Sequence, residues 1–472
     1  MLGAGVAGLT TALALARSDH EVIVLERDIP PVPGSVEDAP AWERPGIPHF
    51  LQPHAFLARG TKELLVNAPD VYQALVDVGG GELRLSKKMP PSPPEDDDED
   101  LRFLGCRRPV IEWVLRQIVS KEPNVSLRSG VTTLGLEWAQ KGAEIPRATG
   151  ALTPEGPVLA DLVVDAMGRS SQLSDWIVDG GGSAPEMEGD DCGIVYYSRY
   201  FRFRRGHGRP DGPWLLGPRA ELGYLETGTF WGDNDTFAIV QQIKADDRPL
   251  RVLRHPDNWM ASLRSQPIFE PLVDEEVSEP ITSVLPMGQL RNTLRRFVAD
   301  GRPIASGVVA IGDSLCHTNP RYAWGLSLSI FQGFLLADLV ERHGKDSESL
   351  VTAFDAAVHP WAKAAFDVAT ATDNERKRYW SGEPIDFTAP SDGLQLFLLM
   401  VLPIAGTKDA VIFRKAVRRM MLLDNPHDIE KDRALLERGA EIVRGIVASA
   451  TPPPQGPPRD ELIELVRVSG SE

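Results

Sequence analysis

The sequence lacks the features that mark several large classes of protein. No apolar run reaches the roughly 18 residues that a membrane-spanning helix needs. The richest apolar run, Leu394–Gly406, is shorter and contains Pro403, which favours a core helix over a membrane-touching one. The formal net charge is −17, and this acidic excess argues against a nucleic-acid partner, because phosphate binding needs clustered Lys and Arg.

Cysteine and metal-binding patterns are also scarce. The three cysteines are Cys106, Cys192 and Cys316, and no two of them form a CxxC pair. An odd number of cysteines without a secretory signal favours the reducing cytoplasm. No HExxH motif, Cys/His cluster or EF-hand loop occurs, so we expect no metal site. The composition is otherwise that of a globular protein, and 472 residues predict two or three domains.

A glycine motif at the start of the chain predicts a dinucleotide site. The motif reads Gly3-Ala4-Gly5-Val6-Ala7-Gly8, and its context is a helix over Leu9–Arg17, a strand over Val22–Leu25 and then Glu26. The first glycine permits a tight turn, the second lets the backbone approach a pyrophosphate, and the third allows close helix–sheet packing. Glu26 is placed to accept hydrogen bonds from an adenosine ribose.

The strand that normally precedes such a motif is almost missing. Only Met1 and Leu2 stand before the glycines. We therefore expect a truncated gene start, because the two neighbouring strands would otherwise keep orphan backbone groups at about 1–3 kcal/mol each. A form extended at its N-terminus is expected to be more stable and to retain more of the dinucleotide.

A second motif lies near residue 313. Gly312-Asp313 follows a strand over Val308–Ile311, and Pro320 and Gly325 come before a helix over Leu326–Glu341. A carboxylate here can bond the hydroxyls of a flavin, and the helix N-terminus would face the flavin pyrimidine edge. The alternative is an ordinary Gly-Asp turn with a helix cap. The spacing and the context favour the flavin interpretation.

The remaining patterns predict an α/β fold with a Rossmann-like FAD-binding domain, an inserted β-rich substrate domain and a C-terminal helical region. We expect the FAD-binding domain over 1–185 and 286–345, the β-rich domain over 186–285, and the helical region with a Pro-rich tail over 346–472. A helix is expected over Val110–Val119 and a buried strand over Leu159–Ala166. The acidic, Pro-rich segment at about 86–100 is expected to be a mobile loop.

These motifs and their order resemble the FAD-dependent monooxygenase superfamily of para-hydroxybenzoate hydroxylase, and most closely its branch of bacterial epoxidases and hydroxylases. Three further segments carry the likeness, namely Arg44–Pro48 with His54, Arg108–Glu112 and Leu162–Ser171. The likeness extends over roughly residues 3 to 340, and the C-terminal helical residues fall outside it.

The resemblance implies a role for each position that matches. The ADP half of FAD would be held by Gly3, Gly5, Gly8 and Glu26, the middle of the cofactor by Arg108, the ribityl chain by Asp313, and the isoalloxazine ring by Pro320 and Gly325. Trp324 would line the substrate pocket, and His317 would assist deprotonation of the substrate or bond within its loop. The resemblance also makes the β-rich domain the roof of the pocket, although its aromatic residues are more simply explained as core.

The resemblance implies a reaction as well. One oxygen atom from O2 would be inserted into a small organic substrate, by epoxidation or hydroxylation, through a flavin C4a-hydroperoxide. Alternatives of the same fold are a flavin-dependent reductase or desaturase, a halogenase, which would need a lysine-centred site and a WxWxIP-like segment, or a non-enzymatic protein. Met167 replaces an Asp that the superfamily often has, and Ala323 replaces a glycine. These departures put rapid reduction by NADPH in doubt, so the electron source is expected to be NAD(P)H or a separate flavin reductase.

Overall fold

The parallel sheet of the first region has its central position filled by the first residues of the chain. The computed structural model describes residues 1–29, 31–139, 142–344, 346–449 and 454–468. Two pairs of parallel strands flank Leu2, which bridges to Leu25 on one side and to Asp165 on the other. The pairs are β1 (Val22–Glu26) with β4 (Val125–Ser129), and β8 (Val163–Asp165) with β19 (Val308–Ala310).

Met1 and Leu2 make the hydrogen bonds of a short strand. The Met1 amino group donates to the Ile23 carbonyl at 2.8 Å, and the Leu2 N–H donates to the Val164 carbonyl at 2.8 Å. Burial lowers the pKa of the Met1 amino group to about 5. The two strands that flank Leu2 are thus joined into one sheet by a very short central segment.

Helices cover this sheet closely. Helix α1 (Val6–Arg17) packs against α8 (Trp324–His343) and α4 (Arg108–Val119), and α2 (Ala58–Asn67) packs against α8. Gly333 of α8 allows α8 to approach α1 closely, because a Cβ at this position would lie only 2.7 Å from the Thr11 hydroxyl. The expected helices of this region are confirmed, with α1 starting three residues and α4 and α8 each two residues earlier than predicted. The buried strand expected over Leu159–Ala166 is wrong in its bounds, because the buried strand covers only Val163–Asp165 and the exposed Leu159 ends the preceding strand, Gly156–Leu159.

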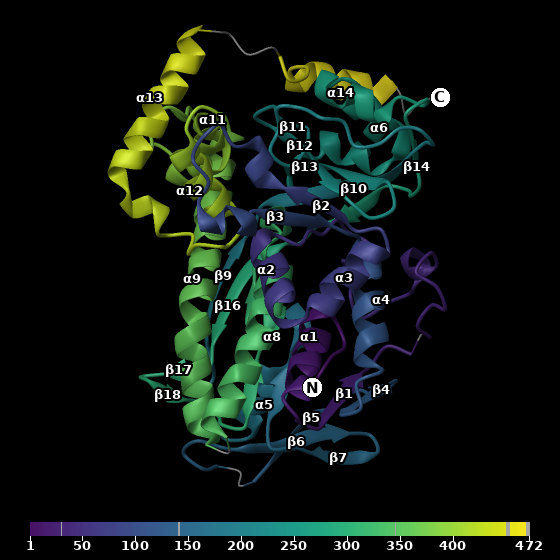
Figure 1. The fold of residues 1–472 in the computed structure, drawn as a ribbon, viewed down its shortest axis with the longest axis vertical. Coiled ribbons are helices and arrows are strands. Elements are labelled where there is room, and N and C mark those ends of the chain that lie inside the picture. The colour runs from purple at the N-terminus through teal and green to yellow at the C-terminus, as the bar shows by residue number, and fades with distance from the viewer. Residues whose placement is uncertain (30, 140–141, 345, 450–453, 469–472) are drawn as a thin grey trace.

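A second, antiparallel sheet forms the β-rich region, which lies at one end of the molecule in Figure 1. Its strand order is β11 (Arg219–Glu221), β12 (Leu225–Trp231), β13 (Thr236–Lys244), β10 (Ile194–Phe203) and β14 (Ser278–Pro280), and β15 (Leu285–Met287) also pairs with β10. A three-stranded sheet of β9 (Glu186–Asp191), β16 (Arg291–Arg296) and β20 (Cys316–His317) connects it to the first region. The domain boundaries expected from the sequence stay predictions.

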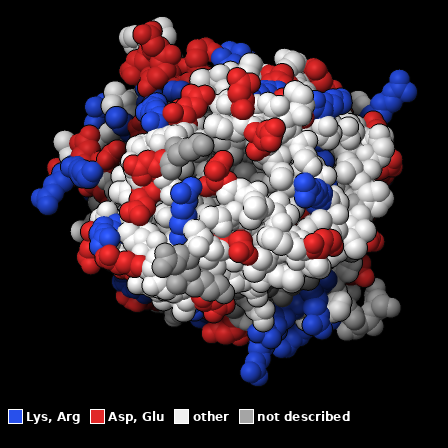
Figure 2. Space-filling model, turned by 90° about the horizontal axis from the view of Figure 1, so that it is seen from below, with Lys and Arg blue, Asp and Glu red and all other residues white. Residues whose placement is uncertain are grey.

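Smaller elements complete these two regions. The helices are α3 (Pro69–Asp77), α5 (Leu173–Asp179), α6 (Pro256–Arg264) and α7 (Glu270–Val273). The strands are β2 (Gly81–Arg84), β3 (Arg102–Gly105), β5 (Gly135–Trp138), β6 (Ala148–Thr153), β7 (Gly156–Leu159), β17 (Val298–Ala299) and β18 (Arg302–Pro303). Figure 2 views the end of the molecule at which β5, β6 and β7 lie, and there Lys and Arg side chains stand in small groups among Asp and Glu.

The C-terminal region is helical. Its elements are α9 (Ser347–Tyr379), α10 (Leu394–Leu396), α11 (Leu402–Gly406), α12 (Ala410–Met420), α13 (Arg433–Ser449) and α14 (Arg459–Val468). Most side chains of the apolar run Leu394–Gly406 are buried, as expected for a core helix. A π-helical turn over Phe397–Val401 interrupts it just before Pro403, whose missing N–H breaks the α-helical ladder. No described helix is long and apolar enough to cross a membrane.

Two polar segments for which the sequence predicts no regular structure contain helical turns or a helix. The acidic segment 86–100 contains short 3-10 helices, and its Asp98 is buried and receives 2.7 Å and 2.8 Å hydrogen bonds from Arg414 of α12. The negative charge of Asp98 is thus compensated by an arginine about three hundred residues further along the chain. Part of the Pro-rich tail, 450–453, lies outside the described residues, but α14 packs on α6 and Arg459 pairs with Asp247 at 2.8 Å.

Candidate cofactor site

One cavity of about 590 Å³ brings the two predicted motifs together. This volume is within the range of about 300–1,000 Å³ that is usual for sites of small molecules and cofactors. Of the predicted site residues, the cavity is lined by Gly3, Gly5, Glu26, Arg108, Asp313, His317, Pro320, Trp324 and Gly325. Gly8 lies outside the lining. Residues from the start of the chain and from the segment after residue 310 therefore line the same cavity.

The three motif glycines have three different environments. Gly3 has a φ of +98°, and a Cβ there would lie 2.7 Å from the Ala166 carbonyl oxygen. A Cβ on Gly8 would overlap the Gly3 carbonyl oxygen, so Gly8 serves close packing of α1. A Cβ on Gly5 would meet nothing nearer than the Arg108 guanidinium at 3.8 Å, so Gly5 borders open space. Helix α1 has no side-chain cap, so its first N–H groups remain available at the cavity wall.

Glu26 belongs to a buried group of ion pairs at the end of β1. Arg44, with only 2% of its side chain exposed, donates to Glu26 at 2.8 Å, to Asp28 at 3.0 Å and to Glu112 at 2.8 Å. Glu26 also accepts from the Ala4 and Asp28 N–H groups. Its Oε1 receives one hydrogen bond from the described residues, which leaves acceptor capacity for a ribose hydroxyl.

Arg108 is fixed between a carboxylate and two histidines. It donates to Glu112 at 2.7 Å and to His49 Nε2 at 2.6 Å, with His54 Nε2 at 3.3 Å. Burial, and then the charge of Arg108, lower the pKa of His54 to about 3 and that of His49 well below its usual value. Both imidazoles are therefore neutral at physiological pH, and their Nε2 atoms can accept from the guanidinium. They orient Arg108 toward the cavity.

Asp313 and His317 form a pair that also lines the cavity. The His317 Nδ1 lies 3.2 Å from Asp313 Oδ2. Burial alone would raise the pKa of Asp313, but His317 and Arg108 outweigh it and hold that pKa below its usual value. His317 Nε2 is buried and has no hydrogen-bond partner within the part of the chain that the structure describes. The charged carboxylate of Asp313 and the unpartnered ring nitrogen of His317 thus belong to neighbouring side chains.

A buried carboxylate joins the middle motif to the Gly312-Asp313 turn. Asp165, at the end of β8, accepts from the Met167 N–H at 2.9 Å and from the Ser314 hydroxyl at 3.1 Å. The Ser314 hydroxyl in turn accepts from the Gly168 N–H at 2.9 Å. Burial raises the pKa of Asp165. These bonds fix the position of Asp313, which precedes Ser314 in the chain.

Cys316–Gly325, which we call the flavin loop, contains a residue with a strained backbone. Ala323 has a φ of +54°, in the left-handed region that glycine adopts most readily. Trp324 follows as the first residue of α8, packs against Tyr322 at 4.9 Å between ring centroids, and donates to the Met420 carbonyl at 3.1 Å. The departure from glycine seen in the sequence therefore lies at a position where the backbone favours glycine.

Sequence reasoning missed the partners that orient the predicted residues. Arg44, Glu112 and Asp165 stand inside the segments that carry the resemblance, but they had no role assigned. The Arg108–Glu112 contact could have been found from its i, i+4 spacing on a helix. The aromatic residues of the β-rich strands that were candidates for the pocket are absent from its lining, where this region contributes Met287.

The residues present fit FAD. The open space beside Gly5, the uncapped start of α1 and His317, whose Nε2 has no partner among the described residues, all belong to the wall of the same cavity. Each offers a contact that a phosphate, a ribose or a ring system can use. The cavity therefore suits an intact dinucleotide cofactor.

The strain at Ala323 gives a prediction. Ala323→Gly should raise the free energy of unfolding by about 0.5–1 kcal/mol, because left-handed backbone costs alanine more than glycine. Denaturant unfolding measures the change. Ala434→Gly, at an exposed position in the right-handed helix α13, is the matched control and should lower stability by a similar amount. A loss of stability in both variants would contradict the assignment of strain.

Comparison with known proteins places the fold. No family model matches the chain. Rv3254 of Mycobacterium tuberculosis is 26% identical over 376 residues, which is 70% of each protein. Among solved structures, the flavin-dependent brominase Bmp2 has a TM-score of 0.60 at 15% identity, covering 95% of this chain and 97% of its own. PqsL of Pseudomonas aeruginosa, a probable FAD-dependent monooxygenase, has a TM-score of 0.57 at 14% identity, covering 81% and 97%.

A third solved structure is similar in fold to this chain as well. The anhydrotetracycline hydroxylase OxyS of Streptomyces rimosus has a TM-score of 0.55 at 16% identity, covering 90% of this chain and 75% of its own. The resemblance noted in the sequence is thereby confirmed at the level of architecture. The chain has the fold of the FAD-dependent monooxygenases related to para-hydroxybenzoate hydroxylase.

Proposed function

We propose that this protein is an FAD-dependent monooxygenase that inserts one oxygen atom from O2 into a small organic substrate by epoxidation or hydroxylation. The observation that carries the proposal is the placement of Glu26 and Asp313 on the wall of one cavity. The two residues come from motifs almost three hundred positions apart, and one extended dinucleotide would contact both. The fold of the structural neighbours supports the same class of reaction.

Each wall of the cavity suits a different part of FAD. Gly3, Gly5 and the start of α1 would hold the pyrophosphate, and Glu26 the adenosine ribose, while Gly8 keeps α1 close to the sheet. Arg108 would contact the middle of the cofactor and Asp313 the ribityl chain. Pro320 and Gly325 would line the isoalloxazine ring. FAD, when bound and reduced by an external electron donor, would supply the oxygen chemistry.

His317 is the candidate for proton transfer. When its imidazole is neutral, the Nδ1 proton is donated to Asp313, and Nε2 is left as an acceptor. A substrate hydroxyl in the cavity could lose its proton to that nitrogen. Trp324 and Pro320 would form an apolar wall that excludes water and orients the substrate.

The other reactions of this fold are less well supported. A flavin-dependent brominase is among the structural neighbours. A halogenase would need a lysine in its site, and no lysine is among the residues that line the cavity in the described part of the chain. A reductase or desaturase remains the second candidate, since the same cavity could hold FAD for either.

One prediction of the proposed function concerns Asp313. Asp313→Ala should yield largely colourless protein, because the substitution removes the carboxylate that would bind the ribityl hydroxyls. The visible absorption of the purified variant measures the FAD content. Asp161→Ala, at an exposed position, is the matched control and should retain the wild-type flavin content. Wild-type flavin stoichiometry in Asp313→Ala would rule out the assignment of this site.

The second prediction concerns the electron source, for which we propose NAD(P)H or a separate flavin reductase. NADPH alone should reduce the flavin slowly, because Met167 and Ala323 replace residues that the superfamily uses in handling flavin and NADPH. Anaerobic stopped-flow absorbance measures the rate, and dithionite serves as the control that the flavin is reducible. Rapid bleaching by NADPH without a partner protein would contradict the prediction.

The third prediction concerns oxygen. With the flavin reduced by any donor, turnover of candidate alkenes and phenols under ¹⁸O2 should give products that carry one heavy oxygen atom. Mass spectrometry of the products, with oxygen uptake measured in parallel, gives the result. Substrate reduced or desaturated without incorporation of oxygen would support the second candidate, and incorporation of halide would support a halogenase.

A further inference from the structure

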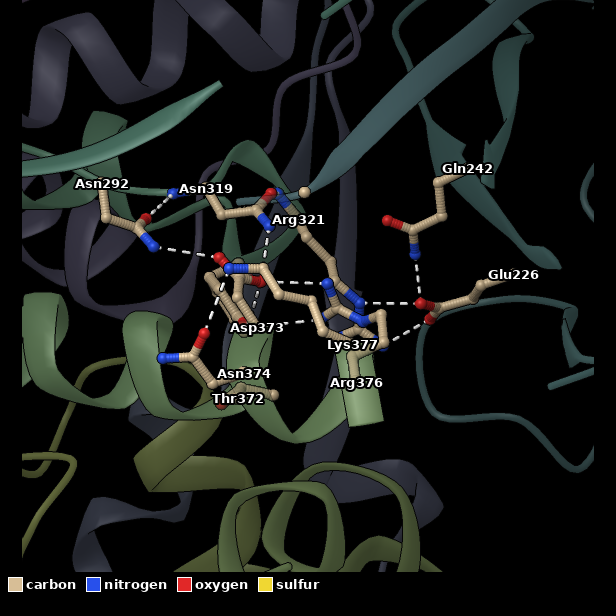
Figure 3. Close-up of polar contacts among 12 residues, drawn as sticks. Glu226, Gln242, Asn292, Asn319, Arg321, Thr372, Asp373, Asn374, Arg376 and Lys377 are labelled. Atoms are coloured by element: carbon tan, nitrogen blue, oxygen red, sulfur yellow. Dashed lines mark hydrogen bonds and ion pairs between the residues drawn. The ribbon is translucent and has the colours of Figure 1, made fainter. Parts of the chain in front are cut away.

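The flavin loop is bonded on its far side to a helix that the sequence analysis left without a role. The residues that face away from the cavity extend toward α9, β16 and β12, and Figure 3 shows the polar contacts among them. Arg321 donates to Glu226 of β12 at 2.8 Å. Asn319 makes the larger set of contacts, and it also stands in the cavity wall beside Pro320.

Asp373 of α9 is the acceptor at the centre of this group. It is 0% exposed. Its Oδ1 accepts from Asn319 Nδ2 at 2.8 Å and from Arg376 Nη1 at 2.9 Å, and its Oδ2 accepts from Asn292 Nδ2 at 2.9 Å. Arg376, one turn further along α9, is 2% exposed and balances the charge. The Tyr322 hydroxyl donates to Oδ1 from 3.4 Å as well. A buried carboxylate with four donors holds them in fixed positions.

Asn319 is held on every side. Its side-chain amide donates to Asp373, and its backbone N–H donates to Asn292 Oδ1 at 2.7 Å. Its side-chain oxygen accepts from the Tyr196 hydroxyl and from the Arg321 N–H. The residue is 1% exposed, so each of these bonds forms away from competing water. The backbone just before Pro320 is therefore set by α9, β16 and β10 together.

We propose that helix α9 positions the cofactor-facing wall of the cavity, with Asp373 as a positioning residue that acts through Asn319. The inference rests on the proposed function, because it assigns the flavin loop to FAD. It gives the C-terminal helical region a part in cofactor binding, although that region lines no part of the cavity within the described residues. Loss of the Asp373 acceptor should release Asn319 and Pro320 and weaken FAD binding.

The geometry allows a compensating pair of substitutions. In Asp373→Asn, the new side-chain NH2 group of residue 373 would face the NH2 group of Asn292, so two donors would oppose each other. Rotating the Asn292 amide by 180° would not help, because its NH2 group would then face the Asn319 N–H, which is also a donor. In the double variant Asn292→Asp/Asp373→Asn, residue 373 donates to residue 292, which still accepts from the Asn319 N–H. Every hydrogen bond of the group is then retained, and the negative charge moves by one side chain.

The test is the dissociation constant of FAD, measured by flavin fluorescence at a temperature where circular dichroism shows each variant folded. Asp373→Asn should weaken FAD binding by about tenfold or more, and the double variant should restore most of it. Asp98→Asn is the matched control, since Asp98 is also buried and paired with an arginine but lies in the acidic segment; it should lower the melting temperature and leave FAD binding unchanged.

Each outcome decides the inference. Unchanged FAD affinity in folded Asp373→Asn, or a weakening that the double variant does not reverse, would overturn it. Should the single variant not fold, Asn292→Ala, which leaves the Asp373–Arg376 pair intact, replaces it, and unchanged FAD affinity there would also overturn the inference. Wild-type protein that binds no FAD would instead refute the proposed function and, with it, this role of α9.

Discussion

The buried carboxylate of Glu112 is the group on which the shape of the cavity depends. It is 0% exposed and holds Arg44 with one oxygen and Arg108 with the other. Arg44 reaches on to Glu26, and Arg108 reaches toward the wall of Asp313. Removing one partner of such a buried pair costs about 3–5 kcal/mol, because the remaining charges lose their compensation. One side chain of α4 thereby aligns the two ends of the predicted cofactor site.

The rest of the cavity depends on bonds between segments that are distant in the sequence. Leu2 joins β1 to β8, and Asp165 joins β8 to Ser314, so the glycine turn, the middle motif and the Gly312-Asp313 turn are fixed relative to one another. Asn319 then connects the flavin loop to α9. The cavity is accordingly lined by stretches of chain that are far apart in the sequence, and these bonds hold the stretches in place relative to one another.

The sequence predicted the parts of this site that are defined by local spacing. The glycine motif opens helix α1, Glu26 ends strand β1 and Asp313 follows strand β19, so their positions could be derived from neighbouring residues. The partners of buried charges could not, because pairing across hundreds of residues leaves no local pattern. The acidic segment near Asp98 is the clearest case, since its composition indicates a solvated loop until Arg414 is known to face it.

Helix α9 illustrates the same limit. Its sequence shows an ordinary long helix, and Asp373 has no pattern that distinguishes it from a surface acid. Arg376 lies on α9 itself, but the donors Asn292, Asn319 and Tyr322 reach that carboxylate only because α9 packs on β16 and on the flavin loop. The aromatic residues of β10 and β12 show the converse, because their alternation along a strand indicated core and the fold uses them as core.

A comparison of FAD with FMN tests the central claim most directly. If Glu26 and Asp313 bind opposite ends of one dinucleotide, calorimetric titration of flavin-free protein should show one FAD per chain, and FMN should bind at least about a hundredfold more weakly because it lacks the half that the glycine turn and Glu26 recognise. Equal affinity for FMN and FAD, or no binding of either, would contradict the account.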